Sequence, residues 1–191
     1  MDYNFLSRTV LFRGSSAEEI RVMLDCLGSE QKHYEKGEII YYSGDTVQSL
    51  GMVLSGRAQI ESDDIWGNKS VLDSVGPGMV FAETYACVPG EPLMVNVVAS
   101  EHADILFLNT ARVLKVCPNS CEHHSKLIRN LLTLSAQKNL NLSRRIFHTS
   151  SKSIRGRLLS YLSFQASQQG SYEFSIPFNR QQLSDFMSVV L

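Results

Sequence analysis

Hydrophobic and polar positions divide the chain into a strand-like part and a helical part. Between His33 and Asn109, short extended runs are separated by glycine-containing turns. The runs are EIIYYS, SLGMVLSG, RAQIES, SVLDSVG, VNVVAS and HADILFLN. Six or more strands in about 75 residues predict a small antiparallel barrel or jelly roll rather than a layered α/β sheet. The less regular piece FAETYACVPGEPLM lies between two of these runs, and its start could form one helical turn.

The ends of the chain follow a helical period. Ser15 or Ser16 followed three residues later by Glu18 or Glu19 is the pattern of a capping box, which predicts a short helix in SSAEEIRVML. After Pro118, about 27 residues without Gly or Pro predict a helix of about 40 Å. SIRGRLLSYLSFQASQQG predicts a second helix, EFSIPF a short strand, and NRQQLSDFMSVV a short helix capped near Asn179.

The long helix carries more apolar residues than one buried face needs. Leu127, Leu131 and Leu134 repeat at spacings of four and three, and Ile128, Leu132, Leu142 and Ile146 widen the stripe. A helix of this kind needs a covering on more than one side. We expect it to pack on its own barrel and on a second copy of itself, with Leu127, Leu131 and Leu134 in the dimer contact. The alternative is a helix packed only on its own domain.

Composition excludes several classes of protein. The 191 residues are 43% hydrophobic and 19% charged, which fits neither a disordered tract nor a fibrous repeat. The sequence holds no apolar run long enough for a membrane span and no signal-like N-terminus, so we expect a cytoplasmic protein. Four cysteines in a chain of this length predict reduced thiols rather than a disulfide scaffold, and Cys26 is expected to be a small core residue.

The net charge of −1 conceals an asymmetry. Residues 1–122 hold nine Lys or Arg against seventeen Asp or Glu, whereas residues 123–191 hold nine against two. A basic segment of this kind indicates a polyanion partner, although a solvated helix surface would look the same.

This order of elements, with the segments YYSGDTVQSLGMVLSGRAQI, GPGMVFAETYACVPGEPLMVNVVAS, SIRGRLLSYL and IPFNRQQLSDFMSV, resembles the Crp/Fnr family of regulators. The resemblance implies a cyclic-nucleotide-binding-like effector domain over residues 1–120, a dimerisation helix over 121–148 and a partial winged helix-turn-helix over 149–191. It also implies an allosterically controlled, DNA-binding homodimer. Arg180, Gln181 and Gln182 would lie in the first helix of the DNA-binding motif. The recognition helix would follow Val190, where the chain stops, so we expect only weak, salt-sensitive DNA binding from these residues.

The loop that would hold the effector departs from the family pattern. By resemblance, the effector pocket is formed by Glu83, Thr84, Tyr85, Leu93, Met94 and Val95. Nucleotide-binding members of the family use a Gly-Glu pair for the ribose and an Arg followed by Ser or Thr for the phosphate. Here the matching pairs are Ala82-Glu83 and Leu93-Met94. An apolar pair cannot offset the desolvation of a phosphate, so we expect an effector other than a cyclic nucleotide, or a filled barrel without ligand.

A second candidate site is a cluster of thiols and imidazoles at the start of the long helix. It consists of Cys117, Cys121, His123 and His124. These side chains suit zinc, an iron-sulfur cluster or haem iron, and a thiol near a helix start is favoured as thiolate. A metal, haem or redox sensor is therefore an alternative. Structural cysteines and helix capping remain a further explanation, because the spacing matches no specific motif.

Other classes of function are less well supported by the residues. A jelly-roll enzyme of the cupin type needs two or three His and a carboxylate that converge on a metal. The predicted barrel holds only His33 and His102, which we expect to be far apart and unpaired, so we expect no enzymatic activity. A dimeric effector domain that does not bind DNA is the remaining alternative.

Overall fold

The computed structural model describes residues 1–63, 69–114, 122–176 and 178–187, which fall into two compact units. The units are Met1–Ser135 and Ala136–Leu191. The boundary at Ser135 lies inside the long helix, whereas three parts dividing at residues 120 and 148 were expected. Cys117 and Cys121 lie outside the described residues.

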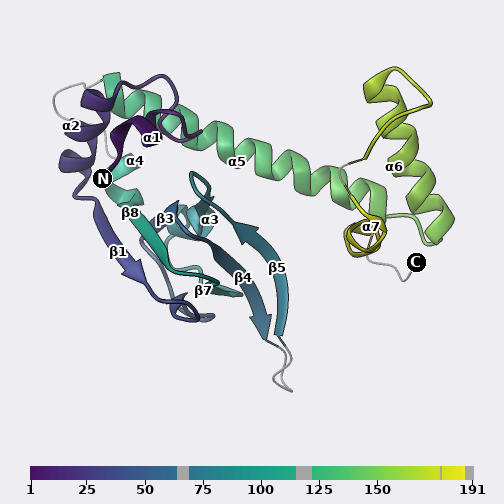
Figure 1. The fold of residues 1–191 in the computed structure, drawn as a ribbon, viewed down its shortest axis with the longest axis horizontal. Helices are drawn as coiled ribbons and strands as arrows, with labels where there is room; N and C mark the ends of the chain where they lie inside the picture. Colours follow the sequence, from purple (N-terminus) through teal and green to yellow (C-terminus); the bar gives the residue numbers. More distant parts are fainter. Residues whose placement is uncertain (64–68, 115–121, 177, 188–191) are drawn as a thin grey trace. The chain divides into compact units, whose positions relative to one another are not determined.

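Two four-stranded antiparallel sheets form the centre of the first unit (Figure 1). One sheet has the order β1-β8-β3-β6 and the other β2-β7-β4-β5. The strands are β1 (Glu30–Tyr34), β2 (Ile39–Tyr41), β3 (Ser49–Ser55), β4 (Ala58–Asp63), β5 (Lys69–Val75), β6 (Val80–Phe81), β7 (Asn96–Ala99) and β8 (Ala103–Asn109). The six predicted runs correspond to β2, β3, β4, β5, β7 and β8, so the antiparallel β architecture is confirmed. The strands β1 and β6 were not predicted.

Helices flank the sheets of this unit. They are α1 (Tyr3–Ser7), α2 (Ala17–Leu27), α3 (Glu83–Cys87), α4 (Thr110–Leu114) and the first part of α5 (Glu122–Thr149). The capping box of α2 is confirmed, because the amide of Glu19 donates to Ser16 Oγ and the amide of Ser16 donates to Glu19 Oε2. The helical turn expected after Phe81 is α3. The helices α1 and α4 were not predicted.

Two hydrophobic cores lie in the first unit. One fills the space between the sheets and includes Val53, Phe81, Ile105 and Phe107. The other packs α1, α2 and the start of α5 against β3 and β8, and includes Phe12, Leu106 and Leu127. Cys26 is exposed, so its expected place in a core is wrong. It lies one position away from the buried stripe of α2.

The second unit contains the end of α5, α6 (Ile154–Gln169) and α7 (Arg180–Met187). Ser153 caps the start of α6, and Gly170 ends it in the left-handed conformation. Asn179 caps α7, since the amide of Gln182 donates to Asn179 Oδ1 and the amide of Asn179 donates to Gln182 Oε1. The strand expected in EFSIPF is wrong for the described residues of that segment, which pair with no other strand.

Candidate functional site

The predicted effector pocket starts at a strained residue. Ala82 has φ 57° and ψ 10°, the left-handed conformation that glycine adopts without cost. It precedes Glu83, which begins α3 and is buried. The hydroxyl of Thr110 donates to the carbonyl of Ala86 and so fixes α3 to the start of α4. The chain therefore keeps the backbone of a glycine turn, with a buried carboxylate after it, although the residue is alanine.

The second half of this pocket is attached to the turn after β2. The amide of Leu93 donates to the carbonyl of Asp45, and the amide of Gly44 donates to the carbonyl of Leu93. Leu93 is buried and Val95 half-buried, whereas the Met94 side chain is 77% exposed. Tyr85 is half-buried and Thr84 exposed. The six predicted residues thus do not share one buried surface, and the interior part of the set is reduced to Glu83, Leu93 and, in part, Tyr85 and Val95.

Aromatic side chains occupy the space between the two sheets. The ring centroid of Tyr41 lies 6.1 Å from that of Phe81 and 5.7 Å from that of Phe107, in edge-to-face geometry. The ring of Tyr34 packs edge-on against Phe107. The hydroxyl of Tyr41 donates to the carbonyl of Ser49, and burial raises the pKa of Tyr41 far above its usual range. These rings give the barrel interior an apolar filling in which the Tyr41 hydroxyl is held by a hydrogen bond.

Cys87, at the end of α3, is not an activated thiol. Burial and the neighbouring Glu83 carboxylate raise the pKa of Cys87 above its ordinary value. A raised pKa lowers the fraction of thiolate at neutral pH, and thiolate is the reactive form.

The leucines expected in the dimer contact pack instead on their own domain. Leu127 and Leu131 are buried in the core formed with α1 and α2, and Leu134 packs against it. Asn130 fixes this part of α5 by donating to the carbonyls of Leu11 and Arg13. Leu127 and Leu131 are thus covered within their own chain, whereas the dimer contact itself, and the half-buried Leu134 in it, stay a prediction. A different set of large apolar side chains on α5 is exposed, namely Leu132, Leu140, Leu142, Ile146 and Phe147.

The described part of the Cys/His cluster consists of two histidines in the first turn of α5. The Nδ1 atom of His123 lies 3.1 Å from Glu19 Oε1, an ion-pair contact without hydrogen-bond geometry. The pKa of Glu19 is lowered, first by its hydrogen bond with the Ser16 amide and then by Lys126. His124 is buried, and its Nδ1 has no hydrogen-bond partner among the described residues. A sensor role for these histidines with Cys117 and Cys121 stays a prediction.

The core of the second unit is aromatic and centres on a histidine. His148 is buried, with its ring centroid 5.7 Å from that of Tyr161 and 5.1 Å from that of Phe164. Its Nδ1 lies 3.0 Å from Ser160 Oγ. Burial lowers the pKa of His148, because the charged ring would lose its hydration.

Arg180, Gln181 and Gln182 form the exposed first turn of α7. The Gln182 side chain is already used in capping. Among the described helices of the whole chain, none combines the length and the apolar composition that crossing a bilayer requires.

Comparison with known proteins identifies the two-sheet domain. Residues 31–120 match the family described as "Cyclic nucleotide-binding domain". That stretch is a cyclic nucleotide-binding domain. A segment of 98 residues is 32% identical to the cyclic AMP receptor protein of Thermus thermophilus, covering 51% of this chain and 44% of the relative. The cyclic nucleotide-binding domain is therefore homologous to that of a Crp/Fnr-type regulator, and the match spans less than half the length of that relative.

Solved structures share the fold of this domain at low sequence identity. A cyclic nucleotide-binding domain from Methylobacillus flagellatus has a TM-score of 0.64 at 19% identity, covering 80% of this chain and 84% of that chain. The Thermus thermophilus catabolite activator protein has a TM-score of 0.58 at 21% identity, covering 95% and 81%. The sensor domain of the transcriptional regulator DNR from Pseudomonas aeruginosa has a TM-score of 0.58 at 16% identity, covering 79% and 95%.

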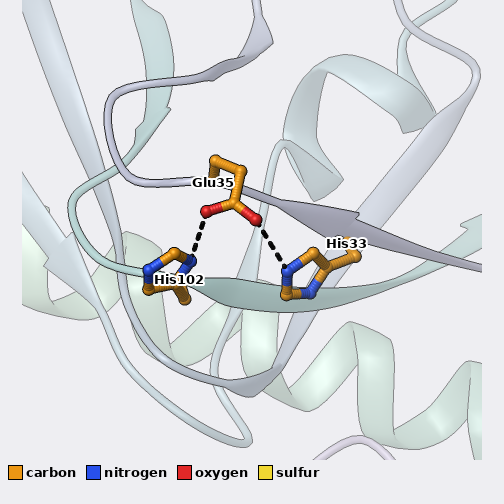
Figure 2. A group of neighbouring side chains, drawn as sticks. All are labelled: His33, Glu35 and His102. Carbon is orange, nitrogen blue, oxygen red and sulfur yellow. Dashed lines mark ion pairs between the residues drawn. The ribbon is translucent and has the colours of Figure 1, made fainter.

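The cyclic nucleotide-binding domain also brings together two histidines that were expected to lie far apart. The pairing of β1 with β8 places His33 opposite Asp104, and His102 lies in the turn just before β8. The ring centroids of His33 and His102 are 6.3 Å apart, and the Glu35 carboxylate contacts both rings (Figure 2). The expectation that these histidines are unpaired is wrong, because β1 is a polar strand that periodicity does not reveal.

Asp104 shapes the electrostatics of this group. Its hydrogen bonds with Ser55 and His33 lower the pKa of the Asp104 carboxyl. The same carboxylate, hydrogen-bonded to His33, raises the pKa of that imidazole, with a smaller contribution from Glu35. His33 is thus held in place from one side by Asp104 while its other nitrogen faces Glu35.

Proposed function

We propose that the chain is the effector domain, the dimer helix and part of the DNA-binding domain of a Crp/Fnr-type transcription regulator. The observation that carries the proposal is the order of its parts. A cyclic nucleotide-binding domain is followed by the 28-residue helix α5 and then by a small helical unit. The homology of the first part to the cyclic AMP receptor protein supports a regulator rather than an enzyme.

Charge supports DNA as the partner of the second unit. Residues 136–191 hold seven Lys or Arg and two Asp or Glu, and Arg144, Arg145, Lys152, Arg155 and Arg180 are exposed. Exposed cations of this density attract the phosphate backbone. Arg180 begins α7, where the positive end of the helix adds to the attraction. A DNA-binding role implies a protein of the cytoplasm.

The effector of this regulator is not a cyclic nucleotide. A buried cyclic phosphate needs a fixed cation and amide donors. From Ser70 to Ala111, a stretch that includes the whole effector loop, the sequence contains no Lys or Arg. Tyr41, Phe81 and Phe107 already fill the space between the sheets. The domain therefore takes an apolar effector or none, despite the name of its family.

A second copy of the chain covers the exposed face of α5. At 100° per residue, Leu132, Leu140, Leu142, Ile146 and Phe147 span an arc of about 160°. This arc is centred away from the Leu127 and Leu131 face, which is already buried. Effector binding would alter DNA binding if it favoured one packing of the two α5 helices over the other. A metal, haem or redox signal through Cys117 and Cys121 would act at the start of the same helix, and it is the second hypothesis for the effector.

DNA binding tests the proposal directly. Fluorescence anisotropy with a random-sequence DNA duplex, measured across a salt series, should show weak binding. The logarithm of the binding constant should fall linearly with the logarithm of the salt concentration. Arg180→Ala should reduce the slope by about one. Arg21→Ala removes an exposed cation from the first unit and serves as the matched control, with an unchanged slope expected. Binding that is absent at low salt, or a slope lowered equally by both variants, would contradict a DNA-binding second unit.

A further inference from the structure

Three side chains that could hold a metal ion converge at one end of the β1–β8 pair. His33 lies in β1, Glu35 directly follows this strand, and His102 lies in the turn between β7 and β8. Figure 2 shows the Glu35 carboxylate between the two imidazole rings. One donor atom from each residue can be chosen so that all three lie within 4.8 Å of one another. The group lies outside the effector loop and outside the Cys117–His124 cluster.

One donor separation already matches a small tetrahedral ion, and a second needs to open. Bonds of about 2.0–2.1 Å to nitrogen and oxygen in a tetrahedral site place neighbouring donors about 3.4 Å apart. His33 Nε2 lies 3.5 Å from Glu35 Oε1. His102 Nδ1 lies 2.5 Å from Glu35 Oε2, a contact that would open by about 1 Å around an ion. All three side chains are more than half exposed, so this adjustment meets no packed neighbour.

An outer carboxylate orients one of the ligands. His33 Nδ1 lies 3.2 Å from Asp104 Oδ1, and Ser55 Oγ donates to Asp104 Oδ2 at 2.8 Å. Histidines that bind metals commonly donate their second ring N–H to a carboxylate, which fixes the tautomer and turns the free lone pair toward the ion. An ordinary surface ion pair does not need this arrangement. The contact of His33 Nδ1 with Asp104 leaves Nε2 of His33 facing Glu35 and His102.

We propose that His33, Glu35 and His102 form a binding site for a divalent transition-metal ion of the zinc class. Two imidazole nitrogens and one carboxylate are a donor set that suits Zn²⁺ and leaves a coordination position open. His33 also lines an open depression with Lys32, Tyr34 and Glu38, which leaves room for a further ligand. The bound ion would join the β7–β8 turn to the end of β1 and so stabilise the first unit.

Titration of the whole chain, freed of metal with a chelator, tests the site with Zn²⁺ in calorimetry and Co²⁺ in visible absorption. We expect one ion per chain at this site and visible d–d bands of Co²⁺ without a near-ultraviolet thiolate charge-transfer band. His102→Ala and Glu35→Gln should weaken Zn²⁺ binding at least about tenfold, and Asp104→Asn by about 10- to 100-fold. Glu101→Gln, an exposed carboxylate next to His102, is the matched control and should bind as the wild type does.

The cysteine cluster is the competing location for a metal and has its own variant. The Cys117→Ser/Cys121→Ser variant should still bind Zn²⁺ at the histidine site. In His102→Ala, binding at that site should be lost. Binding that survives His102→Ala and Glu35→Gln but disappears in the double cysteine variant would overturn the proposal. The absence of any Zn²⁺ binding by the folded wild type would also overturn it. His102 is an exposed turn residue, so circular dichroism of His102→Ala should match the wild type and exclude unfolding as the cause.

Discussion

Gly51 lies directly opposite Phe81 across the β3–β6 pair, and its missing side chain is what leaves room for the Phe81 ring between the sheets. A Cβ atom at position 51 would overlap the ring of Phe81. The ring in turn packs edge-on against Tyr41. The filling of the barrel interior thus depends on one glycine in the middle of a strand.

Gly51→Ala should lower the free energy of unfolding of the first unit by about 1–3 kcal/mol, because the ring must leave its position. Phe81→Ala alone should cost about 3–5 kcal/mol. In the Phe81→Ala background the added methyl at 51 has room, so the second substitution should cost little more. Urea unfolding of the four chains gives the coupling energy. If the losses in free energy of unfolding from Gly51→Ala and Phe81→Ala were additive in the double variant, the overlap with the Phe81 ring would not be the cause of the Gly51→Ala effect.

Ala82→Gly should stabilise the first unit by about 0.5–1 kcal/mol. The left-handed conformation costs alanine about 1–2 kcal/mol, which is offset in part by the packing of its methyl against the core between the sheets. Ala86→Gly, four residues later within α3, is the matched control and should destabilise by about 1 kcal/mol or more. Thermal and urea unfolding would measure both. A loss of stability in Ala82→Gly would mean that the strain is absent in solution.

His148 should make the second unit sensitive to acid. Burial holds the folded pKa of His148 below the unfolded value of 6.5. The unfolded state therefore binds more protons below that pH, and stability falls as the pH decreases through 6.5, by at most about 1.4 kcal/mol per pH unit. Hydrogen exchange of α6 across pH 5–8 measures the effect within the whole chain. His148→Gln should remove this dependence.

The exposed His33 is the control for that experiment. Its folded pKa is raised, so its contribution to stability is present at low pH and is lost as the pH rises through the folded value. His33→Gln should leave the acid sensitivity of α6 unchanged. Equal acid sensitivity of α6 in wild type and His148→Gln would contradict the assignment.

The two faces of α5 should respond differently to substitution. Leu127→Ala removes a fully buried side chain and should cost about 2–5 kcal/mol in urea unfolding. Leu132→Glu and Ile146→Glu alter side chains that are 68% and 60% exposed, so they should leave the fold intact. Both should shift the sedimentation of the chain from dimer toward monomer, because a charge would be buried in the contact.

Gln137→Glu adds the same charge to α5 at an exposed polar position and should leave the dimer unchanged. A monomeric wild type, or dimers that persist in both Leu132→Glu and Ile146→Glu, would remove α5 as the dimer contact.

Local patterns predicted much of the fold. The Ser16–Glu19 capping box, the Gly170 helix end and the Asn179 cap depend on neighbours within four residues, so the sequence displays them. The strand β1 has the sequence EQKHY and lies at a sheet edge, and its largely exposed side chains show no apolar alternation. The strand was therefore missed, and with it the approach of His33 to His102.

The other differences between the predicted and the observed structure depend on contacts between residues that are far apart in the sequence. Periodicity shows that Leu127 and Leu131 are buried, but it cannot tell whether α2 or a second chain covers them. The EFSIPF segment has the composition of a strand, yet a strand also needs a partner, which the described residues do not supply. The effector loop could be located only by resemblance, and the exposure of Met94 could not be foreseen from its apolar character.

We propose that this cyclic nucleotide-binding domain belongs to a regulator that does not respond to cyclic nucleotides. Calorimetric titration of the chain with cyclic AMP and cyclic GMP tests it most directly, with the Thermus thermophilus cyclic AMP receptor protein as the positive control. We predict no saturable binding tighter than about 1 mM for either nucleotide, since the stretch from Ser70 to Ala111, which includes the effector loop, contains no Lys or Arg. A dissociation constant of about 1 μM for either one would show instead that the domain is a receptor for that nucleotide.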